Sequence, residues 1–238
     1  MNTLGDTDFL PWNGLIGGLE PDEGELLVAT ARHAGLARLA PELLSADELN
    51  RGRQFHVPAD RDRFFAAHAL KRRLLGALLD IQGSQLRFEQ QDEGKPKLMG
   101  NGLHFNLSHS GDWVALAVSA TAPVGIDVEQ GDTTPPEELL SVVLHPYDQF
   151  SPKPFSPTEH FYTAWTLKEA VSKGLGMGLA LPFVQLRLEP TAPARYQCSY
   201  GGESWHAGHR RLEHGAHLAF ACRSPWKKIR LLRVGSAD

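Results

Sequence analysis

The chain has 238 residues, of which 42% are hydrophobic and 22% are charged. This length suits one large domain or two small ones that share a core, and the composition excludes disordered, collagen-like and coiled-coil proteins. The 24 Lys and Arg residues against 28 Asp and Glu residues give a formal net charge of −4 at pH 7. That balance argues against a nucleic-acid partner or an anionic membrane surface.

Cysteine usage and the amino terminus point to one compartment. Two cysteines are too few for a disulfide framework, and no Cys-x-x-Cys spacing indicates structural zinc. Residues 1–18 contain acidic but no basic side chains, so no secretory signal is predicted. The most apolar stretch, residues 114–126, is too short to span a bilayer. We expect a soluble cytoplasmic protein without a membrane partner.

The first half is predicted to combine short strands with one long helix. Ser45 is expected to cap a helix, with Glu48 at the reciprocal position of a capping box. The long helix is expected to start near Asp60 and to run until Gly83. Strands are expected at residues 26–29, 85–90, 103–107 and 113–119.

The second half is predicted to follow a link at residues 121–123. Residues 131–157 are rich in proline and are expected to be irregular around one short helix. A helix is expected around residues 161–173. Strands at residues 124–129, 183–188, 218–222 and 229–234 are expected to complete this half.

The two halves resemble each other. Residues 64–71 match residues 161–168 at four of eight positions, and residues 111–118 match residues 215–222 at three of eight. The two matches occur in the same order, with offsets of 97 and 104 that one loop insertion would reconcile. The pattern predicts an α+β fold built from two copies of one unit.

An acidic alternation marks the start of the second half. In Val124–Glu129, apolar and acidic residues alternate, which places Asp127 and Glu129 on one face of a strand. Two neighbouring carboxylates repel each other unless a cation or water lies between them. A hard divalent ion, Mg²⁺ above all, suits such oxygen ligands. The alternative is a solvated pair on an edge strand.

The helix at residues 165–173 carries polar residues on one stripe. Trp165, Glu169 and Lys173 follow one another at intervals of four residues. Glu169 and Lys173 are explained either by a surface ion pair or by an inward face on which a metal and a phosphate satisfy both charges. Trp165 on the same stripe favours the inward face.

A third polar segment, His104–Asp112, lies between two predicted strands. Ser108 and His109 have the residue types of a nucleophile and its base, but neither a Gly-x-Ser-x-Gly motif nor a triad order is present. They fit better as hydrogen-bond donors to an anion.

Together these segments resemble the ordered signature of 4′-phosphopantetheinyl transferases of the Sfp type. The matching motifs are Phe105–Ser110, Gly125–Glu129 and the Trp-x-x-Lys-Glu-Ala-x-x-Lys pattern of residues 165–173, with Gly94–Pro96 as a further element. The length suits the two-lobed, monomeric members of that family. The resemblance implies a pseudo-twofold pair of α+β lobes, each a small antiparallel sheet on a long helix, at residues 1–122 and 123–238. It places the active site at their interface.

The resemblance also implies a reaction. The phosphopantetheine arm of coenzyme A is transferred to a serine of an apo acyl or peptidyl carrier protein, and 3′,5′-ADP is released. Asp127, Glu129 and Glu169 would bind Mg²⁺, with Mn²⁺ as an alternative, and Glu169 would be the base, directly or through water. Lys173 and His109 would stabilise charge on the transferring group.

Further basic residues are assigned to coenzyme A by the resemblance alone. Arg51, Arg63, Lys95 and Ser108 would bind the 3′-phosphate and the neighbouring phosphates, together with His109 and Lys173. A basic residue usual in the family is replaced by Glu48. Residues 51–73 carry seven Lys and Arg against two acids, which is either a solvated helix face or a local patch for phosphates and an acidic carrier protein.

Other residues invite alternative functions. A zinc site at the C-terminal histidines lacks the His-Glu-x-x-His order, and the glycines at 174, 176 and 178 are expected to end a helix. The alternatives to the transferase are a Mg²⁺-dependent phosphohydrolase and a non-catalytic carrier-binding module. Fatty-acid, polyketide and nonribosomal-peptide carriers all remain open as partners. The histidines concerned are His206, His209, His214 and His217, with Glu213 among them.

Overall fold

The structure is a computed structural model that describes the whole chain except residues 1–8, 13–20, 91–94, 132, 154–155 and 236–238. None of the described helices is both long and apolar enough to span a membrane. The helices are α1 (His33–Leu36), α2 (Ala40–Leu43), α3 (Ala46–Arg53), α4 (Pro58–Leu78), α5 (Glu137–Val143) and α6 (Pro157–Leu175). The strands are β1 (Leu10–Trp12), β2 (Glu25–Arg32), β3 (Phe88–Gln90), β4 (Pro96–Leu98), β5 (His104–Ser110), β6 (Trp113–Ser119), β7 (Val124–Gln130), β8 (Arg187–Ala192), β9 (Arg195–Tyr200), β10 (Glu203–Arg211), β11 (Ala216–Cys222) and β12 (Lys228–Val234). Short 3₁₀ turns lie at η2 (Ala37–Leu39), η3 (Gly83–Gln85), η4 (Gly178–Ala180), η5 (Phe183–Gln185) and η6 (Glu213–Gly215).

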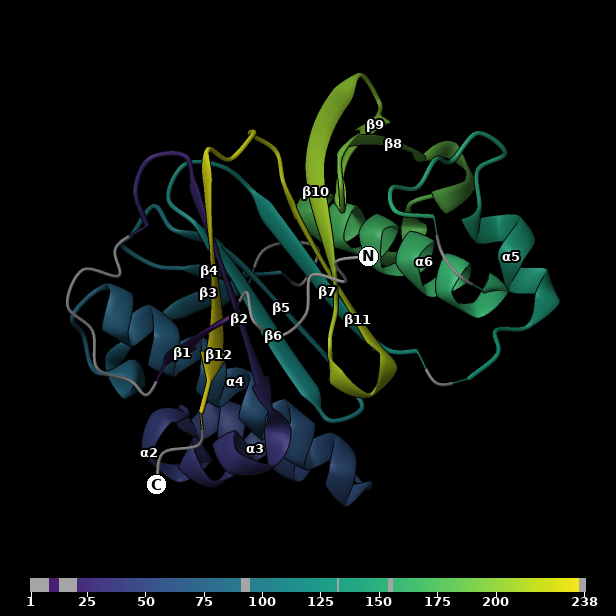
Figure 1. Ribbon diagram of the computed structural model, residues 1–238. Helices are drawn as coiled ribbons and strands as arrows, with labels where there is room; N and C mark the ends of the chain where they lie inside the picture. The colour runs from purple at the N-terminus through teal and green to yellow at the C-terminus, as the bar shows by residue number, and fades with distance from the viewer. Residues whose placement is uncertain (1–8, 13–20, 91–94, 132, 154–155, 236–238) are drawn as a thin grey trace.

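Two five-stranded sheets form the centre of the protein (Figure 1). The first has the order β1-β12-β2-β6-β5 and the second the order β7-β11-β10-β9-β8, while β3 and β4 form a separate hairpin. The predicted α+β class is confirmed. The second sheet is antiparallel throughout, but β12 runs parallel to both β1 and β2, so an antiparallel first sheet was a wrong prediction.

The strand predicted at residues 229–234 does not complete the second half. It forms β12 and lies between β1 and β2 in the first sheet, where it is drawn in yellow beside the purple β2 (Figure 1). Arg230 donates from Nε and Nη2 to the two carboxylate oxygens of Glu25, at 2.9 and 2.7 Å. The Glu25–Arg230 pair stabilises the contact between β12 and β2, which are neighbours in the sheet but far apart in the sequence. Leu231 and Leu232 are buried and add apolar contacts.

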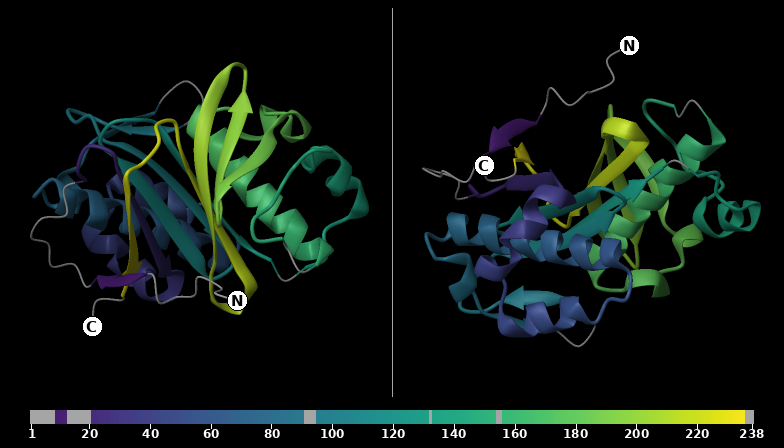
Figure 2. Two further views of the ribbon diagram at one scale, coloured as in Figure 1. Left: turned by 45° about the horizontal axis from the view of Figure 1, so that its top comes forward. Right: turned by 90° about the horizontal axis from the view of Figure 1, so that it is seen from below.

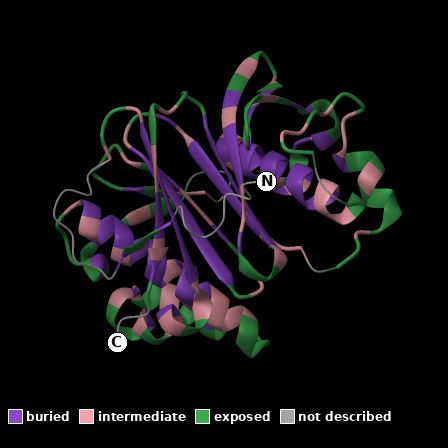
Figure 3. Ribbon diagram, in the orientation of Figure 1, coloured by how far each residue is buried: buried purple, intermediate pink, exposed green. Residues whose placement is uncertain are grey.

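Three apolar cores follow from the alternation of side chains along the strands. On β6, Val114 packs toward α4, whereas Ala115 packs between the two sheets. On β7, Ile126 also packs between the sheets. Residues 125, 127 and 129 therefore point to the other face, against which α6 packs. Strands β6 and β11 are buried along their full length (Figure 3), and α4 and α6 lie on different sides of the strands (Figure 2).

The ends of α6 are defined by sequence. Ser156 accepts a hydrogen bond from the backbone of Glu159 at 3.1 Å and Pro157 occupies the first turn, as expected at a helix start. Gly176 follows the last turn with φ +84°, a conformation that glycine adopts without strain. The predicted end of the helix at the glycines is confirmed.

Gly125 allows α6 to lie directly on β7. A Cβ atom at this position would lie 1.8 Å from the carbonyl oxygen of Ala170 and 2.5 Å from the amide nitrogen of Gly174. Both atoms belong to the α6 backbone, which cannot shift as a side-chain tip can. The close contact brings the middle of α6 next to the acidic end of β7.

Two strands begin later than predicted, β3 at Phe88 and β8 at Arg187, where a buried cation binds backbone carbonyls. Residues 183–185 form a 3₁₀ turn before β8, and the carbonyl of Phe183 accepts a hydrogen bond from Lys168 at 3.1 Å. Residues 83–85 likewise form a 3₁₀ turn before β3, and Arg72 donates to the carbonyl of Gly83 at 2.7 Å. The backbone turns toward these charges instead of extending into a strand.

Candidate functional site

The two carboxylates of β7 face α6 rather than solvent. Asp127 is 2% exposed and Glu129 is half-buried. The alternative of a solvated pair is therefore wrong. Asp127 lies opposite Ala219 and Glu129 opposite His217 on the neighbouring β11, so an internal strand fixes their positions.

The stripe on α6 faces these carboxylates. Glu169 is buried, and the ammonium of Lys173 lies 2.6 Å from Asp127 Oδ1. Lys173 thus bridges from the helix to the strand, and the alternative of a surface ion pair with Glu169 is wrong. Trp165, one turn before Glu169, packs on Phe161 and Phe183, which confirms that this stripe faces inward.

The acids influence one another electrostatically. Burial raises the pKa of Glu169 to about 7; the charge on Lys173 opposes this effect, and those on Asp127 and Glu129 add to it. Burial and the charge on Asp127 also raise the pKa of Glu129. Burial disfavours the charge on Lys173, but Asp127 outweighs it and raises the pKa of the lysine. The negative charges of the three acids therefore stabilise any positive charge that lies between them.

These residues fit a hard divalent cation in chemistry. Asp127 Oδ2 is buried and has no hydrogen-bond partner among the described residues, and the mutual repulsion of the three acids would be relieved by a cation. No three His, Cys, Asp or Glu side chains in the described part of the chain are already arranged as a metal centre. In this arrangement, Lys173 supplies the positive charge at Asp127 Oδ1.

Ser108 lies beside the same carboxylate. It is 6% exposed, donates to Asp127 Oδ1 at 2.9 Å and accepts from Lys173 at 3.0 Å. Its single hydroxyl hydrogen is thus committed to Asp127. The contact with a nucleotide phosphate that the resemblance implies stays a prediction.

A pocket of about 790 Å³ opens next to the acids. It extends from α3 and α4 to the end of α6, and Lys173 and His109 lie at its edge near the acids. Phe55, Phe64 and Phe88 contribute aromatic walls. Eight basic side chains and three acids line it: Arg51, His68, Lys71, Arg72, Arg87, Lys95, His109 and Lys173, with Asp47, Glu48 and Glu89. The lining suits a ligand that carries several negative charges and a flat aromatic group.

Two of the residues expected at the phosphates have other partners. The ammonium of Lys95 donates to the carbonyls of Val124, Lys173 and Gly174 at 3.0, 2.9 and 3.3 Å, and burial lowers its pKa to about 8. Arg63 pairs with Asp60 and is not among the residues that line the pocket. Arg51, in contrast, lies on the pocket wall as expected.

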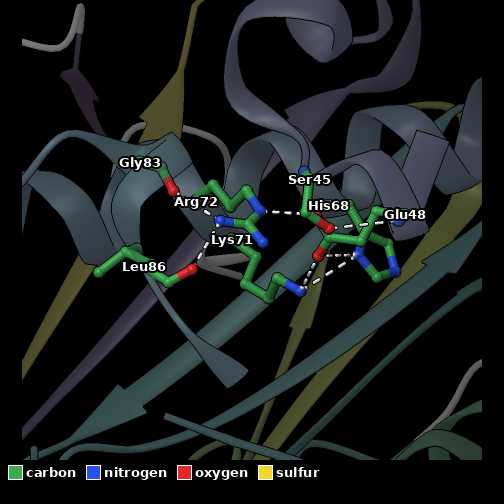
Figure 4. A network of polar contacts seen from close by, with 7 residues as sticks. All are labelled: Ser45, Glu48, His68, Lys71, Arg72, Gly83 and Leu86. Carbon is green, nitrogen blue, oxygen red and sulfur yellow. Dashed lines mark hydrogen bonds and ion pairs between the residues drawn. The ribbon is translucent and has the colours of Figure 1, made fainter. Parts of the chain in front are cut away.

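Glu48 is an internal counter-ion (Figure 4). Its Oε1 accepts from Lys71 at 2.7 Å and lies 2.9 Å from His68 Nδ1, while its Oε2 accepts from Arg72 at 2.5 Å. The capping box with Ser45 is present, as predicted. These bonds hold the pKa of Glu48 far below its usual range despite burial.

The pairing of Glu48 with Lys71 and Arg72 was not recognised from sequence. The only signal was indirect, because the capping box fixes Glu48 at the first turn of α3, which packs on α4. An acid at this place holds two pocket cations in position instead of meeting a ligand itself.

The C-terminal histidines do not form a zinc site in the described part of the chain. His209 Nε2 lies 3.1 Å from His217 Nδ1, and both rings are buried between β10, β11 and neighbouring residues. Burial lowers the pKa of His209 to about 3, and Arg211 and Arg210 lower it further. The pair is neutral and internal.

Comparison with known proteins agrees with this geometry. The model of the 4′-phosphopantetheinyl transferase superfamily matches residues 123–222, and a model of the 4′-phosphopantetheinyl transferase N-terminal region matches residues 35–121. The chain is 36% identical over 163 residues to 4′-phosphopantetheinyl transferase HetI of Nostoc sp. strain PCC 7120, covering 65% of this chain and 69% of HetI. It is 31% identical over 144 residues to 4′-phosphopantetheinyl transferase Sfp of Bacillus subtilis strain 168, covering 58% and 63%.

The two family models meet at residues 121 and 123, where the link between the halves was predicted. The model that matches residues 123–222 covers the acids of β7 and the stripe of α6. The chain belongs to the 4′-phosphopantetheinyl transferase superfamily and is a transferase.

Proposed function

We propose that this protein transfers the 4′-phosphopantetheine arm of coenzyme A to the serine hydroxyl of an apo acyl or peptidyl carrier protein. The observation that carries the proposal is that Lys173, which lines the cation-rich pocket, binds Asp127 and so connects the pocket to the group of three acids. Coenzyme A has a pyrophosphate and a 3′-phosphate, which suit such a lining. The transferases named among the relatives support the same reaction.

Asp127, Glu129 and Glu169 are the residues proposed to hold Mg²⁺, with Mn²⁺ as an alternative. The unpaired oxygen of Asp127 and the mutual effect of the acids on their pKa values support this choice. When bound, the ion supplies charge neutralisation at the pyrophosphate and makes its phosphorus more electrophilic.

Glu169 is proposed as the base for the carrier serine. The described residues donate no hydrogen bond to its carboxylate, which leaves it able to accept the hydroxyl proton directly or through a water molecule. The serine oxygen forms a bond to the phosphorus next to the pantetheine, and the bond from that phosphorus to 3′,5′-ADP breaks. Lys173 and His109, at the pocket edge, are proposed to stabilise the charge that develops.

The phosphates at the nucleotide end are assigned to Arg51 and Arg63, with Lys95 as a residue that shapes the pocket. The position of Arg51 on the wall supports its role, and the charge on Arg63 lowers the pKa of His109 and so acts at the same place. Arg63→Ala should mainly raise the coenzyme A concentration needed for half-maximal rate. Unchanged affinity for coenzyme A would contradict this assignment.

The two lobes, residues 1–122 and 123–238, are proposed to be copies of one unit. A long helix packs on each five-stranded sheet, although β12 of the first sheet comes from residues 228–234, and the aligned Lys71 and Lys168 are both buried beside a carboxylate, at 2.7 Å in each case. One chain provides both sides of the site, which supports action as a monomer. The two free, buried cysteines support the cytoplasm as its compartment.

Incubation with coenzyme A, Mg²⁺ and an apo carrier protein tests the function. We expect the carrier to gain the mass of one phosphopantetheine, as measured by mass spectrometry. Consumption of coenzyme A without that gain would indicate a phosphohydrolase, and carrier binding with neither change would indicate a non-catalytic module. Glu137→Gln, in the exposed part of α5, is a matched control for acid-to-amide variants of the site.

The carrier is tested with a panel. Fatty-acid, polyketide and nonribosomal-peptide carriers, assayed side by side in their apo forms, will rank by the rate of phosphopantetheine incorporation. A carrier that is loaded at a high rate identifies the pathway served.

A further inference from the structure

Strand β5 contacts β7 through side chains instead of through its backbone. Each is the edge strand of a different sheet, and the two lie next to each other. The backbone amides of residues 126, 128 and 130 on β7 donate to side-chain oxygens of residues 106, 108 and 110 on β5, at 2.8, 3.3 and 3.3 Å. We call these three bonds the side-chain ladder. It satisfies edge amides that would otherwise have no partner.

The two serines of the ladder each make a second bond that Asn106 does not. Ser108 donates its hydroxyl hydrogen to Asp127 at 2.9 Å, and Ser110 donates its hydrogen to Glu129 at 2.7 Å. Each serine therefore accepts from one residue of β7 and donates to the carboxylate of the residue before it. Asn106 accepts from Ile126, which follows Gly125, so this bond has no neighbouring acid.

The bonding capacity of Ser108 is fully used. A hydroxyl has one hydrogen to donate and two lone pairs to accept with. Ser108 donates to Asp127 Oδ1 and accepts from Val128 and from Lys173. This arrangement fixes the rotation of the Asp127 carboxylate: Oδ1 is bound, and Oδ2 is left buried without a partner among the described residues.

We propose that Ser108 and Ser110 are positioning residues that hold one oxygen of Asp127 and one of Glu129, so that both carboxylates are oriented toward the divalent cation. Oδ2 of Asp127 is the oxygen left without a partner among the described residues, and Trp165 also contacts the Glu129 carboxylate. The inference rests on the proposed function, because it takes both acids as metal ligands. It assigns to the Ser108 hydroxyl a role in the orientation of metal ligands, besides the phosphate contact that the resemblance implies. Partners of this kind set ligand orientation in metal sites, and their loss typically weakens metal binding by about 10- to 100-fold.

Mn²⁺ binding to the full-length protein, measured by electron paramagnetic resonance with Mn²⁺ alone, tests the proposal without reference to catalysis. We expect Ser108→Ala and Ser110→Ala each to weaken Mn²⁺ binding by about tenfold or more. Ser110→Thr and Ser108→Thr retain the hydroxyl and should restore the affinity. Ser110 is only half-buried, so its variants test the proposal even if Ser108→Ala does not fold.

Two control variants separate orientation from stability. Asn106→Ala removes one bond of the ladder but none to an acid, and Ser199→Ala removes an exposed strand hydroxyl. We expect Asn106→Ala to lower the melting temperature and to leave Mn²⁺ affinity unchanged, and Ser199→Ala to change neither. If Asn106→Ala weakens Mn²⁺ binding as much as the serine variants, the serines act only through the fold, and the proposal is overturned.

The remaining outcomes distinguish the inference from the function beneath it. If the wild-type protein binds Mn²⁺ and both serine-to-alanine variants bind it equally well, the positioning role is wrong and the metal assignment stands. If the wild-type protein binds no Mn²⁺ at millimolar concentration, the metal assignment itself is wrong, and the role of the serines is rejected with it.

Discussion

Helices α4 and α6 use equivalent positions for different purposes. Lys71 in α4 and Lys168 in α6 are aligned in the repeat, and each buried ammonium lies 2.7 Å from a carboxylate that precedes it in the chain. The acid is Glu48 in the first half and Asp148 in the second. In both halves, a buried ion pair fastens the long helix to the segment before it.

The next residues on the same helices differ in chemistry. Arg72 in α4 aligns with Glu169 in α6, and Gly76 aligns with Lys173. Arg72 is satisfied by Glu48 and by the carbonyls of Gly83 and Leu86, whereas no described residue donates a hydrogen bond to Glu169. The comparison shows that the aligned lysines stabilise both halves, whereas the next position is a satisfied cation in the first half and a carboxylate without a described donor in the second.

The largest expected effect is the loss of activity in Glu169→Gln. If Glu169 is the base, the rate of carrier loading should fall by about 10²- to 10⁴-fold. The free energy of unfolding should stay equal or rise, because the variant removes a buried carboxylate that has no described hydrogen-bond donor. Single-turnover loading and urea unfolding measure the two quantities. Carrier loading at the wild-type rate would refute the assignment.

Breaking the aligned ion pairs should destabilise both halves, and the second half more than the first. Lys168→Met leaves the buried Asp148 without its ammonium, so we expect it to lower the free energy of unfolding by about 3–5 kcal/mol. Lys71→Met should cost less, because Glu48 keeps its bond from Arg72. Urea unfolding monitors the change. Lys168→Met combined with Asp148→Asn should recover part of the loss, because the amide removes the unpaired charge and keeps an acceptor for the backbone of His145 or Leu188. A loss in Lys71→Met as large as that in Lys168→Met would show that Arg72 does not compensate Glu48.

Local pattern was sufficient to predict most elements and the acids of the site. Alternation in residues 124–130 defined a strand with Asp127 and Glu129 on one face, and spacing by four placed Glu169 and Lys173 on one stripe. Both signals depend only on neighbouring residues. Gly125 lies within the same motif, but its role in the close contact between β7 and α6 is visible only in the structure.

Features set by distant contacts were not predictable in this way. Strand β12 pairs with β2, about 200 residues earlier, and nothing local in residues 228–234 indicates that partner. Glu48 was read as a substitution in a nucleotide site because its partners, Lys71 and Arg72, lie more than 20 residues away. The contact of Ser108 with Asp127 joins strands of two different sheets, so no local pattern in the sequence indicates it.

Gly125→Ala should reduce both stability and the rate of carrier loading, whereas a matched glycine variant in the first half should reduce stability alone. Its Cβ would collide with the backbone of α6, and overpacking of this kind costs about 1–3 kcal/mol of stability. Because the variant pushes α6 away from β7, the rate of carrier loading should fall as well. In Gly76→Ala the new Cβ would lie 2.6 Å from the carbonyl oxygen of Ile81, so this variant should lower stability without the loss of rate. Gly102→Ala, which has nothing within 4 Å, is the control.

Lowering the pH should reduce the free energy of unfolding through one buried histidine in each half. This is the smallest of the expected effects. Burial lowers the pKa of His68 to about 4 and that of His209 to about 3, so between pH 6.5 and 4.5 the unfolded chain binds protons that the folded chain does not. Each histidine therefore removes up to about 1.4 kcal/mol of stability per pH unit as pH falls.

Other titrating groups also change the stability with pH, so the contribution of the histidines is measured as a difference between wild type and variant. Glu169, with its pKa raised to about 7, acts with the opposite sign, since the folded chain takes up its proton first as pH falls. The stability supplied by Glu48 is lost only below about pH 4.5, outside this window. The histidine contribution is thus the difference between wild type and variant in urea unfolding at pH 6.5 and 5.0. His68→Gln and His209→Gln should each flatten the pH dependence of the free energy of unfolding. An unchanged slope in His209→Gln would mean that His209 is protonated in the folded protein, although it lies beside His217 and is followed by Arg210 and Arg211.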